Sequence, residues 1–193
     1  AYERKIDLFR MYQLGEDLNK IKFAVNTKKR DNTGMDSYVL DDEADDLEEE
    51  YKEGKYQPLS VVQAVEICKD IVRIFADKNI DIIRIGLQNT EEISDPKNEG
   101  SEVVAGPYHP AFRQLVESAM WYDAIVGKIK KLNAKVKEVE VSVNPIDSNN
   151  VIGHKKENVI KLKNTYDVDL ILKQDKTIKQ GKSRINITKT YDN

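Results

Sequence analysis

The fold is decided by two neighbouring stretches: residues 136–145 read VKEVEVSVNP, and residues 151–172 read VIGHKKENVIKLKNTYDVDLIL. Apolar and charged side chains alternate over 136–143, which is typical of a β-strand with one buried face, and Asn144-Pro145 ends it. The second stretch predicts a helix from about residue 154 to 166 followed by a strand at 168–172. A last strand is expected at 184–188, after Gln180-Gly181. The order of these elements predicts an α/β class, with α+β as the alternative.

Upstream, the clearest signal is a helix beginning after Ser60. Ser60 and Gln63 form a capping-box pattern, in which the hydroxyl accepts the third amide of the helix and Gln63 reaches back. Apolar residues at helical spacing carry this helix to about 78. The short run at 81–87, DIIRIGL, predicts a strand buried on both faces, and a long helix is expected from 110 to about 132. Together they predict a partial parallel α/β unit.

Composition excludes several function classes. The 193 residues contain one cysteine, Cys68, so an internal disulfide framework and a cluster held by several thiolates of this chain are excluded. Apolar runs are too short to cross a bilayer, which needs about 20 residues, and we expect no membrane partner and a cytoplasmic location. The first residues, AYERK, carry neither Met nor an apolar secretory core, so we expect a piece of a longer protein.

Charge is divided unevenly along the chain. Residues 1–127 hold 16 Lys/Arg against 26 Asp/Glu, while residues 128–193 hold 15 against 8. Such asymmetry points to an anionic partner for the basic part, although solvated lysines alone give the same picture. The almost continuously acidic segment 41–50 predicts a self-repelling linker, since the calcium-loop spacing with its central Gly is absent.

The most specific local pattern begins at Gly153. It resembles the KH-type RNA-binding module, in which a Gly-x-x-Gly loop clamps a single-stranded backbone before a helix. Gly153 and His154 would let phosphates approach a helix N-terminus, and Lys155, Lys156 and Lys161 would add cations. The second glycine is replaced by Lys156, and Tyr166 is the only nearby aromatic. The alternative is a structural helix entry with exposed lysines.

Three expected regions follow from these patterns. Residues 1–46 form an N-terminal helix, at about 6–25, and an acidic linker. Residues 47–134 form an α/β unit, and residues 135–193 form a small basic KH-like α+β unit.

Other candidate positions are weaker. Gly86 and Gln88 lie at the end of the expected strand, and His109 and Arg113 lie in and after a Pro-containing loop. Such loops often face a ligand, so these four positions are candidates for ligand contact. Each also has a packing, turn or capping alternative. We find no Walker loop, dinucleotide loop or nucleophile elbow, and we assign no catalytic and no metal-binding residue. A free-standing enzyme using His109 and a carboxylate is the least favoured alternative.

Four ordered segments carry a family resemblance: residues 51–60 (YKEGKYQPLS), 83–88 (IRIGLQ), 105–113 (AGPYHPAFR) and 149–155 (NNVIGHK). Together they resemble the C-terminal portion of a bacterial radical SAM family related to the catalytic subunit of elongator, over residues 47–193. That family implies a partial barrel with a 4Fe-4S cluster and S-adenosylmethionine, and members near elongator act on tRNA. The cluster needs a C-x-x-x-C-x-x-C arrangement, which a single Cys68 does not supply, so we expect no cofactor in this chain.

The resemblance implies a role as well as a fold. We expect a non-catalytic C-terminal region that works with a radical SAM core outside this chain and docks an RNA such as tRNA. The alternative is a structural or interaction module that covers the parent barrel or mediates homo-oligomerisation, without binding nucleic acid.

Overall fold

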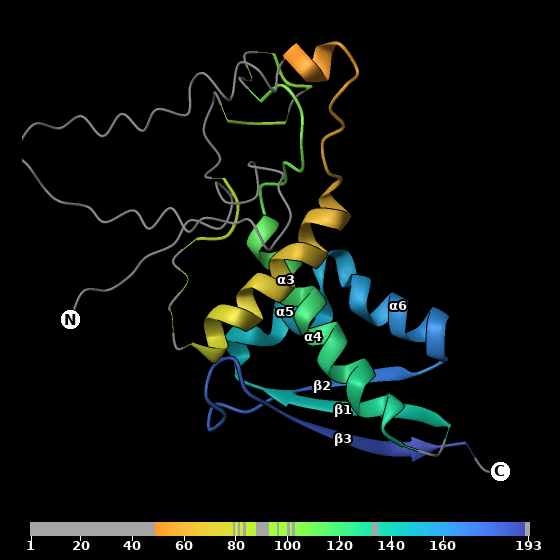
Figure 1. Ribbon diagram of the computed structural model, residues 1–193. Coiled ribbons are helices and arrows are strands. Elements are labelled where there is room, and N and C mark those ends of the chain that lie inside the picture. The colour runs from red at the N-terminus through yellow and green to blue at the C-terminus, as the bar shows by residue number, and fades with distance from the viewer. Residues whose placement is uncertain are drawn as a thin grey trace, which may run out of the picture. The chain divides into compact units, whose positions relative to one another are not determined.

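The computed structural model describes residues 49–191, except 79, 81, 83, 88–92, 96, 100, 102, 133 and 134. Its contacts divide the chain into two compact units, Ala1–Phe112 and Arg113–Asn193, which are treated separately below (Figure 1). The expected helix at 6–25 and most of the acidic segment lie outside the described residues. The region boundaries expected at 46/47 and 134/135 stay predictions.

The first unit contains helix α3, Val61–Asp77. The predicted capping box is confirmed: Ser60 Oγ accepts the Gln63 amide at 3.3 Å, and Gln63 Oε1 accepts the Ser60 amide at 2.9 Å. Because these bonds satisfy backbone donors that the first turn leaves free, they fix where the helix begins. One face of α3 is buried, and its apolar members are Ala64, Val65, Cys68, Ile71 and Phe75.

The strand expected at 81–87 is wrong for the residues that the structure describes there. Among 80, 82 and 84–87, Arg84 makes an isolated bridge and no strand is formed. A short apolar run does not distinguish a strand from another buried segment, and Gly86 has a φ of 91°, which interrupts extended backbone.

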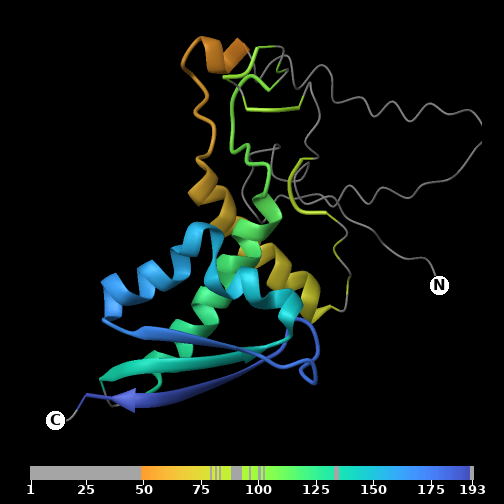
Figure 2. The same cartoon turned by 180° about the vertical axis from the view of Figure 1, so that it is seen from behind.

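The second unit holds the remaining elements, and its fold class is confirmed as helices with a small mixed sheet (Figures 1 and 2). These elements are α4 (Phe112–Lys130), β1 (Val136–Val143), η1 (Pro145–Asp147), α5 (Ser148–Ile152), η2 (His154–Lys156), α6 (Glu157–Tyr166), β2 (Asp169–Gln174) and β3 (Ser183–Thr190). All but the first residue of α4 belong to this unit.

The sheet has the order β2-β1-β3, so the valine-rich strand β1 is central. It pairs in parallel with β2, with Val139 opposite Leu170 and Val141 opposite Leu172. It pairs antiparallel with β3, with Val139 opposite Ile187. A parallel pair requires a crossover, which α5 and α6 supply between β1 and β2. This parallel pair lies within the second unit, whereas the sequence predicts the parallel α/β unit at residues 47–134.

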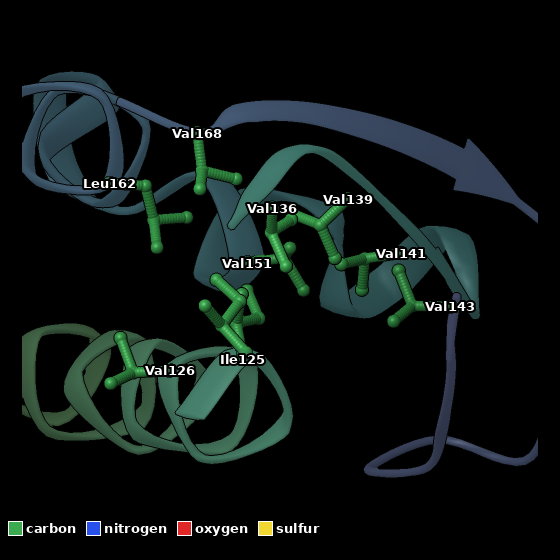
Figure 3. Packing of buried hydrophobic residues seen from close by; sticks show 10 residues of the cluster. Ile125, Val126, Val136, Val139, Val141, Val143, Val151, Leu162 and Val168 are labelled. Carbon is green, nitrogen blue, oxygen red and sulfur yellow. The ribbon is translucent and has the colours of Figure 1, made fainter. Parts of the chain in front are cut away.

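One face of this sheet packs against the helices. Val139, Val141 and Val143 are fully buried and point toward Ile125 and Val126 of α4 (Figure 3). Val151 of α5, Leu162 of α6 and Val168 complete the core with Val136 and Ile129. In both views of the ribbon, α4, α5 and α6 lie on the same side of the sheet (Figures 1 and 2). The alternation seen in the sequence thus separates a core face from a polar face.

The opposite face of the sheet, called here the neutralised sheet face, is covered by ion pairs. Glu138 pairs with Lys189 at 2.7 Å, and Glu140 pairs with Lys173 at 2.6 Å. Arg184 pairs with Asp175 at the end of the sheet. None of the three strands contains an aromatic residue. Lys173, Arg184 and Lys189 are thus paired with acids, and Lys137 of β1 lies 5.5 Å from the Tyr191 ring.

The end of β3 is fastened by Tyr191. Its hydroxyl donates to the Asp167 carboxylate, which also pairs with Lys163, and its amide donates to the Lys135 carbonyl at 2.9 Å. The Lys135 ammonium lies 4.8 Å from the centroid of the Tyr191 ring. The hydroxyl of Tyr191, and after it Lys163, lowers the pKa of Asp167, because both stabilise the carboxylate.

This contact predicts a pH-dependent contribution to stability. A lowered folded-state pKa means that the contribution of Asp167 is present above its ordinary value of 3.8 and is lost as the pH falls through the folded pKa. Tyr191→Phe removes the leading cause, so we expect the pKa of Asp167 to rise toward the ordinary value. An NMR titration of the carboxyl carbon measures it. The pKa of Asp175, lowered mainly by Thr177, is the internal control. An unchanged Asp167 titration would contradict the assignment.

Candidate nucleic-acid interface

The Gly153 loop, residues 153–156, joins α5 to α6 through an unusual backbone. Gly153 has a φ of 84°, and Lys155 and Lys156 have φ values of 50° and 64°. The left-handed region costs a residue with a Cβ roughly 1–2 kcal/mol. The loop is closed by the Gly153 amide donating to the Asn149 carbonyl at 2.9 Å and the Lys156 amide donating to the Gly153 carbonyl at 3.1 Å. Two successive lysines therefore occupy conformations that glycine adopts more readily.

Position 153 requires glycine for a steric reason as well. A Cβ there would lie 2.9 Å from the backbone nitrogen of Asn158 and 3.0 Å from the side-chain Cγ of the same residue. Both atoms belong to the first turn of α6, so the backbone of the loop and that turn are in direct contact. Substitution at Gly153 would have to displace this turn.

Asn158, in the first turn of α6, anchors the segment around the loop through its side-chain amide. Its side chain is 2% exposed, and its Nδ2 donates to the Ser118 carbonyl at 2.8 Å and to the Val151 carbonyl at 3.1 Å. One amide therefore links α4, α5 and α6 at the point where the loop turns. A buried side chain with all these partners holds a single geometry.

A second link ties the loop to the start of α4. Asn150 Nδ2 donates to Glu117 Oε2 at 2.7 Å, and Arg113 Nε donates to Glu117 Oε1 at 2.7 Å. Both oxygens of the Glu117 carboxylate are thus engaged. The loop is fixed at the N-terminal end of α4, about ten residues from Lys128, which corresponds to about 15 Å of helix.

The cations predicted for this site separate into two kinds. Lys155 and Lys156 are exposed, and in the part of the chain that the structure describes they have no ion pair. Lys161 pairs with Glu157 and lies 5.9 Å from the Tyr122 ring, so its charge has partners. His154 is half-buried between Gly153 and the two lysines. The loop therefore brings together Gly153, His154, Lys155 and Lys156, with Lys161 one turn further along α6.

The other candidate positions are not part of this loop. Gly86 is buried, and a Cβ there would lie 2.9 Å from Phe112 Cβ, which accounts for glycine by packing. His109 Nδ1 accepts the Ala111 amide at 3.1 Å, a contact that holds its loop. Arg113 pairs with Glu117, and Gln88 lies outside the described residues. A ligand-facing role for these four stays a prediction.

Residues 44–122 match the family model described as Radical_SAM C-terminal domain. Residues 44–122 are therefore similar to a radical SAM C-terminal domain. Comparisons with curated proteins and with solved structures gave no match. The matched range contains α3 and the first half of α4, and it ends before the sheet. The resemblance to a C-terminal portion of a radical SAM protein is confirmed over this range.

The cofactors of radical SAM proteins can be tested against the residues present. Cys68 is the one cysteine of this sequence, and burial raises the pKa of its thiol to about 11, so it is protonated at neutral pH. Cluster ligands are thiolates. Within the described residues, no group of three or more His, Cys, Asp or Glu is placed to hold a metal ion. These residues do not fit a 4Fe-4S cluster. A search of the same residues finds no helix long and apolar enough to span a membrane.

Sequence reasoning missed Asn158, the residue that positions the site. Its only sequence signal is a lone asparagine at the start of an apolar helical face, where a buried amide needs partners. Those partners are as far as 40 positions away in the sequence, at Ser118, so no local pattern identifies them. The ion pair between Lys161 and Glu157 could have been predicted from the sequence, because residues four apart on a helix are neighbours.

We expect Asn158→Ala to lower the free energy of unfolding of the second unit by about 2 kcal/mol, because it removes buried hydrogen bonds. Asn164→Ala, in the exposed part of the same helix, is the control and should change it by less than about 0.5 kcal/mol. Urea denaturation followed by the fluorescence of Trp121 measures both, since this single tryptophan packs against the core of that unit. Equal effects of the two substitutions would refute the anchoring role.

Proposed function

We propose that the second unit, residues 113–193, docks the RNA substrate of a radical SAM protein through the Gly153 loop. The observation that carries the proposal is the pair Lys155 and Lys156, which are exposed, without an ion pair in the described structure and on left-handed backbone. Backbone strain of this kind persists only where the surroundings fix it, and it occurs often at ligand-binding loops.

The chemistry of the loop suits a phosphodiester backbone. The loop precedes the N-terminus of the ten-residue helix α6, whose dipole favours anions. Glu157, the acid in the first turn of α6, is paired with Lys161. The fixed loop geometry lowers the entropy that is lost when the lysines bind.

The charge distribution favours the loop over the sheet as the RNA-contacting surface. On the neutralised sheet face Lys173 and Lys189 are paired with acids, and the three strands contain no aromatic residue on which a base could stack. Recognition would therefore act on the backbone and shape of the RNA more than on the sequence of its bases. A folded RNA such as tRNA suits this mode, and we place the protein in the cytoplasm with that partner and with the radical SAM core.

An interaction module is the competing function. In that case the basic unit would cover the parent barrel or mediate homo-oligomerisation, and the lysines would serve solubility. The two functions differ in one measurable property, the affinity for RNA. A packing module has no salt-dependent affinity for RNA.

We expect the full chain to bind a fluorescent tRNA pool, with an affinity that falls steeply as salt rises. Lys155→Gln/Lys156→Gln should weaken binding and lower the slope of log affinity against log salt by about 1.4, at about 0.7 for each single-strand phosphate contact. The matched control is Lys128→Gln/Lys130→Gln, which removes the same charge from exposed lysines near the other end of α4. Fluorescence anisotropy at several salt concentrations gives both affinity and slope.

Two results would reject the proposal. Absence of binding at low salt would leave the interaction module as the function of the unit. Equal slopes for the two double variants would show that the Gly153 loop contributes only net charge.

A further inference from the structure

Eight lysines after residue 127 have no ion pair or ring contact among the described residues. They are Lys128, Lys130, Lys131, Lys155, Lys156, Lys176, Lys179 and Lys182. Three of them lie within the β2–β3 loop, residues 175–182, and all three are exposed. This loop is the second concentration of unpaired positive charge near the Gly153 loop, and the function proposed above does not use it.

The β2–β3 loop has a defined backbone made of two consecutive turns. The Ile178 amide donates to the Asp175 carbonyl at 3.1 Å, and the Lys182 amide donates to the Lys179 carbonyl at 3.0 Å. Asp175 Oδ1 accepts the Thr177 amide at 2.8 Å, which closes the first turn from the side chain. Gly181, with a φ of 73°, supplies the left-handed position of the second turn. The three lysines therefore project from a fixed frame.

Long-range bonds attach this frame to the corner between β1 and α5. Asn144 Nδ2 donates to the Ile178 carbonyl at 2.9 Å, and the Gly181 amide donates to Asp147 Oδ2 at 2.8 Å. Asp147 is 5% exposed, and the Ile178 side chain is buried beside these contacts. The loop is thus anchored at both of its turns, although it lies at the surface.

The acids near the lysines are already engaged. Asp175 is the one acid within 175–182, and its carboxylate accepts the hydroxyl and amide of Thr177 and pairs with Arg184. Asp147 is buried and accepts the Gly181 amide. Nothing described in the loop neutralises Lys176, Lys179 or Lys182, so three positive charges face solvent together.

Helix α5 connects the two groups of lysines. The β2–β3 loop is fixed at the N-terminal end of α5, where Gln174 Nε2 also donates to Ser148 Oγ at 3.1 Å. The Gly153 loop follows its C-terminal end. Helix α5 has five residues and is about 7.5 Å long. In duplex DNA, neighbouring phosphates of one strand are about 3.4 Å apart along the helix axis. At a similar spacing, a few nucleotides span both anchor points.

We infer that the β2–β3 loop is a second phosphate-binding surface, and that one RNA backbone segment contacts Lys155 and Lys156 at one end of α5 and Lys176, Lys179 and Lys182 at the other. This inference rests on the proposed RNA-docking function and adds to it a direction for the strand, along α5. It also defines the partner as an RNA whose backbone presents several adjacent phosphates, in preference to a single anion.

The test compares three variants of the full chain against a fluorescent tRNA pool: Lys176→Gln/Lys179→Gln/Lys182→Gln, Lys155→Gln/Lys156→Gln, and the control Lys128→Gln/Lys130→Gln/Lys131→Gln. The control removes the same three charges at the opposite end of β1. We expect the first triple variant to lower the salt slope by about 2, at about 0.7 for each contact, and the control to leave it close to that of the unchanged chain. Poly-glutamate of similar length is the second probe.

The outcomes separate this inference from the function on which it rests. No binding by the unchanged chain overturns both. Weaker binding by the Lys155/Lys156 variant, with the β2–β3 variant equal to its control, overturns the second surface alone. Loss of binding in the β2–β3 variant alone supports that surface and rejects the Gly153 loop. Equal affinity of the unchanged chain for poly-glutamate and tRNA overturns the RNA-specific inference, because the loops would then take any polyanion.

Discussion

The geometry of the second unit depends on one buried amide. Asn158 joins the backbone of α4 at Ser118 to the backbone of α5 at Val151, and its own backbone fills the space that a Cβ at Gly153 would need. A polar side chain in this position is stabilising only when its partners are all in place, because an unpaired buried amide costs more than an apolar residue would. The three helices are therefore held in one arrangement, and the valine face of β1 packs against a fixed surface.

Several cations of this unit are matched by acids at close range, as with Lys173 and Glu140 or Lys161 and Glu157. Exposed pairs of this kind contribute little to stability, but they cancel the local field. The lysines of the two loops keep their charge uncompensated. Five of the eight lysines that lack an ion pair or ring contact among the described residues thus lie in the Gly153 loop and the β2–β3 loop.

How much of this could be predicted from the sequence depends on how far apart the interacting residues are. The capping box at Ser60 and the alternation over 136–143 are local, and both were predicted correctly. The run at 81–87 was also local, but its apolar residues fit more than one buried conformation, and the predicted strand is not formed in its described residues. The Gly153 loop was found through its glycine and lysines. Its anchoring by Asn158, and the attachment of the β2–β3 loop to Asn144 and Asp147, join residues between 7 and 40 positions apart, so only the folded chain reveals them.

The left-handed lysines give the strongest reason to connect this geometry with binding. The KH-type loop that the sequence resembles has a glycine at the position of Lys156, and the backbone here has a φ of 64°, a conformation that glycine adopts readily. A lysine in that conformation costs roughly 1–2 kcal/mol that a glycine would not. A surface lysine without an ion pair returns no comparable stability to the folded chain. The surrounding fold holds this strain, which is typical of ligand-binding loops and agrees with the phosphate contact proposed at the N-terminal end of α6.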